Sequence, residues 1–79
     1  MLYRQTETVD VWRSYHCATL WSISECDDDG EIRCIGGDDD MEDAWAGGCE
    51  RAEEIGVPCV LMHESGEEIR RYTPEPVHD

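Results

Sequence analysis

The chain has 79 residues, in which 20 acidic side chains stand against six basic ones, and the formal net charge is -14 at pH 7. Every basic residue is an arginine. One domain of this length has no room for a deep catalytic cleft, and three tryptophans and three tyrosines are atypical of a disordered acidic tail. Repulsion between so many negative charges lowers the stability of a compact fold, so we expect the charge to have a use. The prediction is attraction of a cationic partner, and the alternative is adaptation to high salt.

The amino-acid sequence indicates neither a targeting signal nor a framework of disulfides. No apolar stretch approaches the ~20 residues of a membrane span, and the first eight residues lack the features of a secretion signal. We therefore expect a cytoplasmic protein without a membrane partner. In that compartment the cysteines should be reduced thiols, and their odd number argues against closed pairing. They are Cys17, Cys26, Cys34, Cys49 and Cys59.

The first half of the chain predicts strands. Residues 9–14 alternate between apolar and polar side chains, so they form either a strand of their own or an extension of the next one. That next strand covers residues 18–26, with Trp21, Ile23 and Glu25 on one face.

A hairpin turn is expected at residues 27–30, where Asp-Gly stands between two β-prone runs, and residues 31–35 form the returning strand. With a loop of even length, Ile32 and Cys34 lie on the same face as Trp21 and Ile23.

A helix follows and ends at about Ile55. Asp39 and Glu42 fit an acidic capping box at its start, and Gly56 ends it. Gly47 and Gly48 lower helix propensity, so close approach to a strand is the expected compensation. One apolar face is predicted to pack on the sheet. It comprises Met41, Trp45, Gly48, Ala52 and Ile55, widened by Ala44 and Cys49.

The last part predicts a second hairpin. Residues 57–62 form a buried, central or nearly central strand, residues 63–66 a turn, and residues 67–73 a returning strand with Ile69 inward. The fold class is therefore α+β: an antiparallel sheet of four to five strands in β-β-β-α-β-β order, with one helix on one face. Residues 1–73 form one domain and residues 74–79 a loose tail.

Two resemblances add to this pattern. Residues 18–72, through Trp21, Gly30, Ala44, Gly56 and the run His-Glu-Ser-Gly at 63–66, resemble small phage and bacterial domains built as hairpin, helix, hairpin. The size, the α+β fold and the acidic charge also resemble phage-encoded anti-CRISPR proteins of the nucleic-acid-mimic type. That second resemblance implies binding to a CRISPR effector of the Cascade type inside a bacterial host cell, which would block its access to DNA.

Mimicry requires carboxylates in rows with spacings like those of a phosphate backbone. Asp43, Glu50 and Glu54 share one helix face, with Asp39 and Glu53 at its edges, and two acidic turns can flank it. Any one acidic run more often just faces water. The predicted partner-binding residues are Asp27, Asp28, Asp29, Asp38, Asp39, Asp40, Asp43, Glu50, Glu53, Glu54, Glu64, Glu67 and Glu68.

Aromatic side chains are candidates for anchoring a partner, although core packing is the commoner role. They are Trp12, Tyr3, Tyr15 and Tyr72. Arg70 and Arg71, beside the second turn, are expected to form local ion pairs, with a place on the binding rim as the alternative.

The sequence gives little indication of a catalytic site or a metal site. His16 and Cys17 are neighbours on a strand and point to opposite faces, and His63 near Cys59 or Cys49 is better explained by a structural cysteine. The cysteine spacings match no zinc site, and the acidic residues around Asp27 lack both end ligands of a calcium loop.

The sequence therefore predicts a non-enzymatic acidic inhibitor, without cofactor or metal, that binds the basic nucleic-acid-binding surface of another protein. It does not itself bind nucleic acid, and it is a monomer or weak dimer. The alternative is a small acidic protein-protein interaction or regulatory domain without mimicry.

Overall fold

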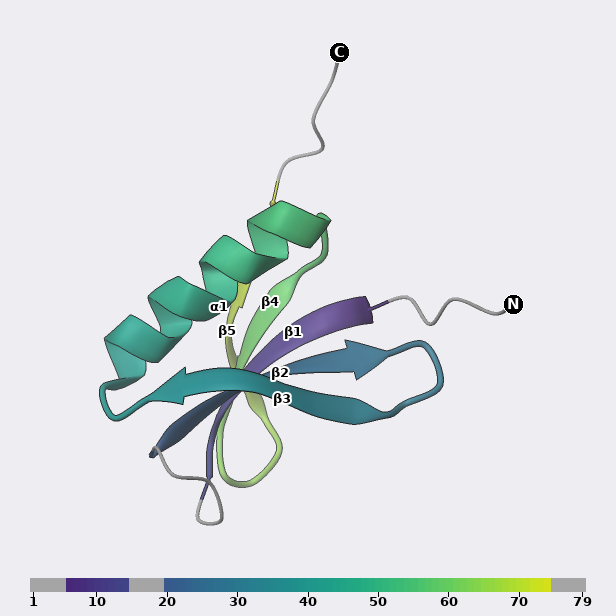
Figure 1. The fold of residues 1–79 in the computed structure, drawn as a ribbon. Coiled ribbons are helices and arrows are strands. Elements are labelled where there is room, and N and C mark those ends of the chain that lie inside the picture. The colour runs from purple at the N-terminus through teal and green to yellow at the C-terminus, as the bar shows by residue number, and fades with distance from the viewer. Residues whose placement is uncertain (1–5, 15–19, 75–79) are drawn as a thin grey trace.

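The computed structural model describes residues 6–14 and 20–74 as one sheet with one helix (Figure 1). The α+β class and the predicted element order are confirmed. Tyr3, Tyr15, His16, Cys17 and the predicted tail at 75–79 lie outside the described residues. The elements are β1 (Thr6–Arg13), β2 (Trp21–Asp27), β3 (Ile32–Asp38), α1 (Met41–Ile55), β4 (Cys59–Met62) and β5 (Glu68–Tyr72).

The sheet has five strands in the order β3-β2-β1-β4-β5. Neighbouring strands are antiparallel except β1 and β4, which pair in parallel, so the sheet is mixed and not antiparallel throughout. The cause is α1, which carries the chain back across the sheet to the end where β1 begins. Strand β4 then runs in the same direction as β1 and pairs with it, as a crossover helix permits.

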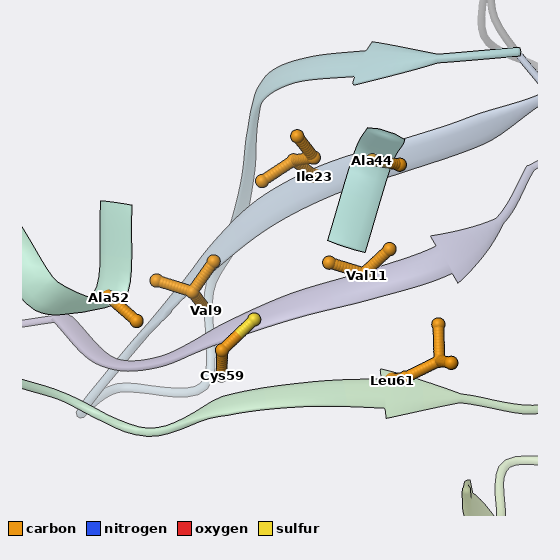
Figure 2. Close-up of a cluster of buried hydrophobic side chains, with 7 residues drawn as sticks. All are labelled: Val9, Val11, Ile23, Ala44, Ala52, Cys59 and Leu61. Atoms are coloured by element: carbon orange, nitrogen blue, oxygen red, sulfur yellow. The ribbon is translucent and has the colours of Figure 1, made fainter. Parts of the chain in front are cut away.

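The core lies between α1 and one face of the sheet (Figure 2). Alternation along each strand places one set of side chains under the helix, and the predicted helix face packs on them: Ala44, Gly48 and Ala52 are buried. The partly buried residues beside them include Met41, Trp45, Cys49 and Ile55, as the sequence predicted. The buried hydrophobic cluster comprises Val9, Val11, Ile23, Ala44, Ala52, Cys59 and Leu61.

Gly48 is where the helix comes closest to the sheet. A Cβ at this position would lie 2.6 Å from Cγ2 of Val11 and 3.0 Å from Sγ of Cys59. At Gly47 the nearest atom would be Cδ1 of Ile23, at 3.1 Å. The close approach that the sequence predicted is thus confirmed, and its tightest point is Gly48.

An aspartate caps the start of α1 and a glycine caps its end, as predicted, but the capping aspartate is one residue later than expected. Asp40, not Asp39, is the N-cap, and its Oδ1 accepts the amide hydrogens of Glu42 and Asp43 at 2.9 and 3.1 Å. At the other end Gly56 has a φ of 72° and donates its amide hydrogen to the carbonyl of Ala52. The left-handed conformation suits glycine because it has no Cβ.

The first hairpin turn lies where it was predicted, but its loop is odd and not even. The amide of Asp27 bonds the carbonyl of Glu31 at 2.8 Å, which leaves three residues between them. Cys34 therefore lies opposite Ser24, and Ile32 opposite Cys26, on the face away from the helix. The predicted shared face with Trp21 and Ile23 is wrong, because an odd loop inverts the parity of the returning strand.

The second hairpin turn is confirmed, with Gly66 donating its amide hydrogen to the carbonyl of His63 at 2.9 Å. Strand β4 is buried and lies next to central β1, also as predicted. Ile69 is not inward, since it remains 55% exposed. The register shifts between Leu61 and Met62, so that Arg70 lies opposite Leu61 and Glu68 opposite Met62. Because Cys59 and Leu61 face the core, their partners Tyr72 and Arg70 have the inward positions, and Ile69 next to Arg70 faces the other side.

Candidate partner-binding surface

Four acidic side chains lie on the solvent side of α1, opposite its buried residues, and we call them the outer helix face: Asp43, Glu50, Glu53 and Glu54. All four are exposed. The hydroxyl of Tyr72 donates to Glu53 at 2.7 Å, and Arg51 donates to Glu54 at 3.1 Å. No arginine of the described residues forms an ion pair with Asp43 or Glu50.

Three further carboxylates continue this surface at the start of the helix, and each also has a local structural role. Asp40 caps α1, Asp39 accepts the amide hydrogen of Leu20 at 3.1 Å, and Asp38 accepts that of Asp40 at 3.1 Å. Carboxylates at a helix start are stabilised by the positive end of the helix dipole. The structure therefore brings Asp40 next to Asp43 of the outer helix face, while Asp39 is bound to Leu20 and Asp38 is partly buried at the end of β3.

The two acidic turns lie at opposite ends of the sheet (Figure 1). The β2–β3 turn is at the end where α1 finishes, and the β4–β5 turn is at the end where α1 starts. Asp28 and Asp29 are exposed. Asp27 is only 3% exposed, and its Oδ1 has no hydrogen-bond partner among the described residues. Its place in a partner-binding set is therefore corrected: the hairpin end buries this carboxylate in the free protein.

Carboxylates of the second hairpin are largely neutralised by arginine. Arg71 donates to Glu68 at 2.7 Å, and this hydrogen bond holds the pKa of Glu68 below its usual range. Nε of Arg13 lies 3.9 Å from Oε1 of Glu64, while Glu67 is exposed. The predicted local ion pair of Arg71 is confirmed. This turn therefore adds less uncompensated charge than its sequence suggests.

Arg70 turns to the helix and not to the turn beside it. Its guanidinium nitrogens lie 3.4 Å from the carboxylate oxygens of Glu42, and its Cζ lies 5.4 Å from the ring centroid of Trp45. This cation–π contact holds the start of α1 against edge strand β5. Each arginine of the described residues thus lies within ion-pair distance of a carboxylate: Arg13, Arg33, Arg51, Arg70 and Arg71.

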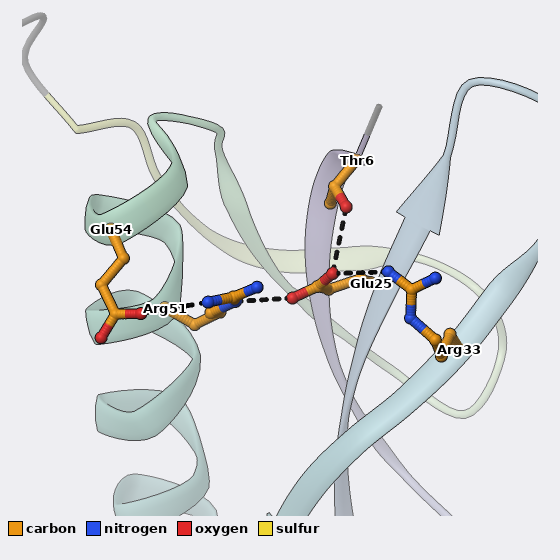
Figure 3. A network of polar contacts seen from close by, with 5 residues as sticks. All are labelled: Thr6, Glu25, Arg33, Arg51 and Glu54. Carbon is orange, nitrogen blue, oxygen red and sulfur yellow. Dashed lines mark hydrogen bonds and ion pairs between the residues drawn. The ribbon is translucent and has the colours of Figure 1, made fainter. Parts of the chain in front are cut away.

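Glu25 is the centre of a polar network under the helix that sequence reasoning missed (Figure 3). Its side chain is 2% exposed and accepts hydrogen bonds from Arg51 at 2.6 Å, Arg33 at 2.9 Å and Thr6 at 3.0 Å. Burial raises the pKa of Glu25, but these three donors outweigh burial and hold the pKa below its usual range. A signal existed: Glu25 was predicted on the same face as Ile23, and a charge on that face requires partners.

The aromatic candidates separate into two groups. Trp12 lies on the sheet face away from the helix, where its Nε1 donates to Oγ of Ser24 at 3.0 Å. Tyr72 packs against the core under α1, which is the commoner role that the sequence analysis gave for these side chains. Tyr3 and Tyr15 lie outside the described residues.

Two thiols meet inside the protein. Cys59 is fully buried and Cys49 is partly buried, and each thiol influences the pKa of the other. Burial, together with the neighbouring Cys49 and Asp10, raises the pKa of Cys59 to about 12. His63 lies elsewhere, with its Nδ1 3.0 Å from Oγ of Ser65. Within the described residues, no three His, Cys, Asp or Glu side chains come together in a way that would hold a metal ion.

Comparisons of this chain with models of protein families, with curated protein sequences and with solved structures gave no match. Over residues 6–14 and 20–74, no helix has both the length and the apolar character that crossing a membrane demands.

Proposed function

We propose that this protein is an acidic inhibitor that occupies the basic nucleic-acid-binding surface of another protein, and that its target is a CRISPR effector complex of the Cascade type. The observation that carries the proposal is the outer helix face together with Asp38, Asp39 and Asp40. All of these carboxylates except the partly buried Asp38 are exposed, while the described arginines are paired with carboxylates. A groove lined with lysine and arginine attracts such a surface.

The spacing along α1 supports competition with a phosphate backbone. At a rise of about 1.5 Å per residue, Asp43 and Glu50 lie about 10 Å apart along the helix axis, and Glu50 and Glu54 about 6 Å. One strand of a duplex places its phosphates about 3.4 Å apart along the axis. The helix charges thus have separations near two or three phosphate steps. Asp40, the N-cap, lies three residues before Asp43 and extends the row.

The first test measures binding to a Cascade-type complex carrying its guide RNA, at stepped salt and with target DNA as competitor. We expect binding that weakens steeply as salt rises and that is mutually exclusive with DNA. A folded protein that is not retained at low salt would reject mimicry and favour an interaction or regulatory domain.

Two variants with equal net charge make the test specific. Asp43→Asn with Glu50→Gln removes two charges from the outer helix face, whereas Asp28→Asn with Glu67→Gln removes two from the turns. Either pair changes the formal charge from -14 to -14 + 2 = -12. We expect the helix pair to weaken binding about 10-fold and the turn pair much less. Equal losses would assign the effect to total charge and not to the helix.

A further inference from the structure

The place where α1 crosses β4 brings two thiols together. Cys59, the first residue of β4, is fully buried, and Figure 2 shows its sulfur directed away from the strand into the core cluster. A Cβ at Gly48 would lie 3.0 Å from this sulfur, so Cys59 reaches the helix backbone one residue before Cys49. Cys49, the next residue of the helix, packs against the same cluster.

We propose that Cys49 and Cys59 are a dithiol site that low-molecular-weight disulfides oxidise to an intramolecular disulfide, fastening α1 to β4. A disulfide joins residues whose Cα atoms lie about 4.4 to 6.8 Å apart, closer than helix and strand usually pack. Gly48 has no side chain to hold the two elements apart. The same glycine that admits Val11 and Cys59 to the helix backbone therefore also brings Cys49 within reach.

The reaction consists of two thiol–disulfide exchanges. The thiolate of Cys49, the more accessible thiol, attacks one sulfur of the reagent, and the S–S bond of the reagent breaks to release one thiol. The thiolate of Cys59, a minor species because burial raises the pKa of this thiol to about 12, then attacks the Cys49 sulfur of the mixed disulfide and releases the second thiol. Two protein thiols are oxidised, one reagent disulfide is reduced to two thiols, and the two protein protons pass to them.

Other cysteines of the described residues lie on the far face of the sheet. Cys34 is opposite Ser24, and its sulfur lies 3.2 Å from Oγ of Ser22. Cys26 bonds the carbonyl of Asp27. The sheet therefore separates these two thiols from Cys49 and Cys59 in the folded protein.

The test uses the full-length chain with Cys34→Ser and 2-hydroxyethyl disulfide as the probe, because the protein charge would repel an anionic reagent. Trypsin cleavage after Arg33, Arg51 and Arg70 leaves Cys49 as the one cysteine of peptide 34–51 and Cys59 as the one cysteine of peptide 52–70. We expect these two peptides to be cross-linked, an intact mass lower by two hydrogens without retained reagent, and a Tm higher by roughly 10 °C. Adding Cys49→Ser should abolish all three effects.

The proposal is overturned if Cys49 and Cys59 both react with iodoacetamide after oxidation and unfolding, or if Cys49 keeps the reagent while Cys59 stays free. A cross-link from either peptide to residues 14–33 in place of the expected one would also overturn it. The peptide map of the Cys34→Ser protein decides the question even if the Cys49→Ser variant fails to fold. None of these readouts involves a partner protein.

Discussion

The inner and outer faces of α1 are built from different chemistry. The inner face uses Ala44, Gly48 and Ala52 to bring the helix against the sheet, and the buried carboxylate of Glu25 on the sheet beneath has three hydrogen-bond donors. The outer face carries exposed carboxylates, of which Asp43 and Glu50 pair with no arginine of the described residues. Stability and surface charge are thus located on separate sides, so each can be changed alone.

The largest loss of stability is expected when Glu25 keeps its charge and loses its arginines, in Arg33→Met with Arg51→Met. The buried carboxylate then keeps Thr6 as its one hydrogen-bond donor among the three described. Without the two arginines, burial dominates and raises the pKa of Glu25. In the natural protein the folded pKa is depressed, so this contribution is present above the unfolded value near 4.5 and is lost as pH falls through the folded pKa. Urea unfolding between pH 3 and pH 7 measures it.

The double variant should reverse that sign. Its folded pKa lies above the unfolded one, so its deficit relative to the natural protein is full at pH 7 and shrinks as Glu25 becomes protonated. Glu68→Gln with Arg71→Met, which removes an exposed pair, serves as the control and should show little change. A pH-independent deficit in the double variant would mean that Glu25 is not the source of the loss.

The second largest effect separates two adjacent glycines. Gly48→Ala should be less stable than Gly47→Ala by about 2 kcal/mol, because its methyl group meets buried Val11 and Cys59. At Gly47 the methyl group meets only the flexible end of Ile23. Both substitutions gain the same helix propensity, so their difference in unfolding free energy isolates the close contact. Equal stabilities would refute the tight approach at Gly48.

A smaller loss is expected at the boundary between the two faces. Asp40→Ala removes the acceptor for two helix amides and should cost about 1 kcal/mol of unfolding free energy. Asp39→Ala removes the same charge and a single exposed hydrogen bond to Leu20, so its loss should be smaller. Thermal or urea unfolding of both variants tests the assignment, which fails if Asp39→Ala is the more damaging.

The smallest effect on stability belongs to the outer helix face. Asp43→Asn with Glu50→Gln should leave the free energy of unfolding within about 0.5 kcal/mol, with any change toward greater stability as repulsion falls. Circular dichroism and urea unfolding measure this change. A large loss would show that these carboxylates support the fold, and a drop in partner binding could then no longer be assigned to the surface.

Local sequence patterns were sufficient for the elements and for the helix face. The spacing of Ala44, Gly48 and Ala52 identified the inner side of α1, and the Asp-Gly at 29–30 identified the turn. The position of Ile32 could not be obtained in the same way, because one residue more or less in a loop reverses the direction of every side chain after it. The N-cap was misplaced by one residue because Asp39 and Asp40 are adjacent and carry the same side chain, so the sequence does not distinguish them.

Features that depend on distant residues were beyond sequence patterns. The parallel pairing of β1 with β4 depends on where α1 returns the chain, and the burial of Asp27 depends on how the hairpin end packs. The outer helix face was predicted from residue spacing alone. Which carboxylates are paired with arginine became clear only from the contacts of Arg51 and Arg70. Charge counts along the chain do not show which carboxylates are compensated.

The parallel pairing of β1 and β4 also determines the order in which the sheet can be completed during synthesis. Strand β1 leaves the ribosome before the other strands of the sheet, but one of its two neighbours, residues 59–62, is made only after α1. Until then β1 has one unpaired edge in the middle of the future sheet, which is a site for association with other chains. The strong negative charge that we assign to partner binding would also keep nascent copies apart during this interval.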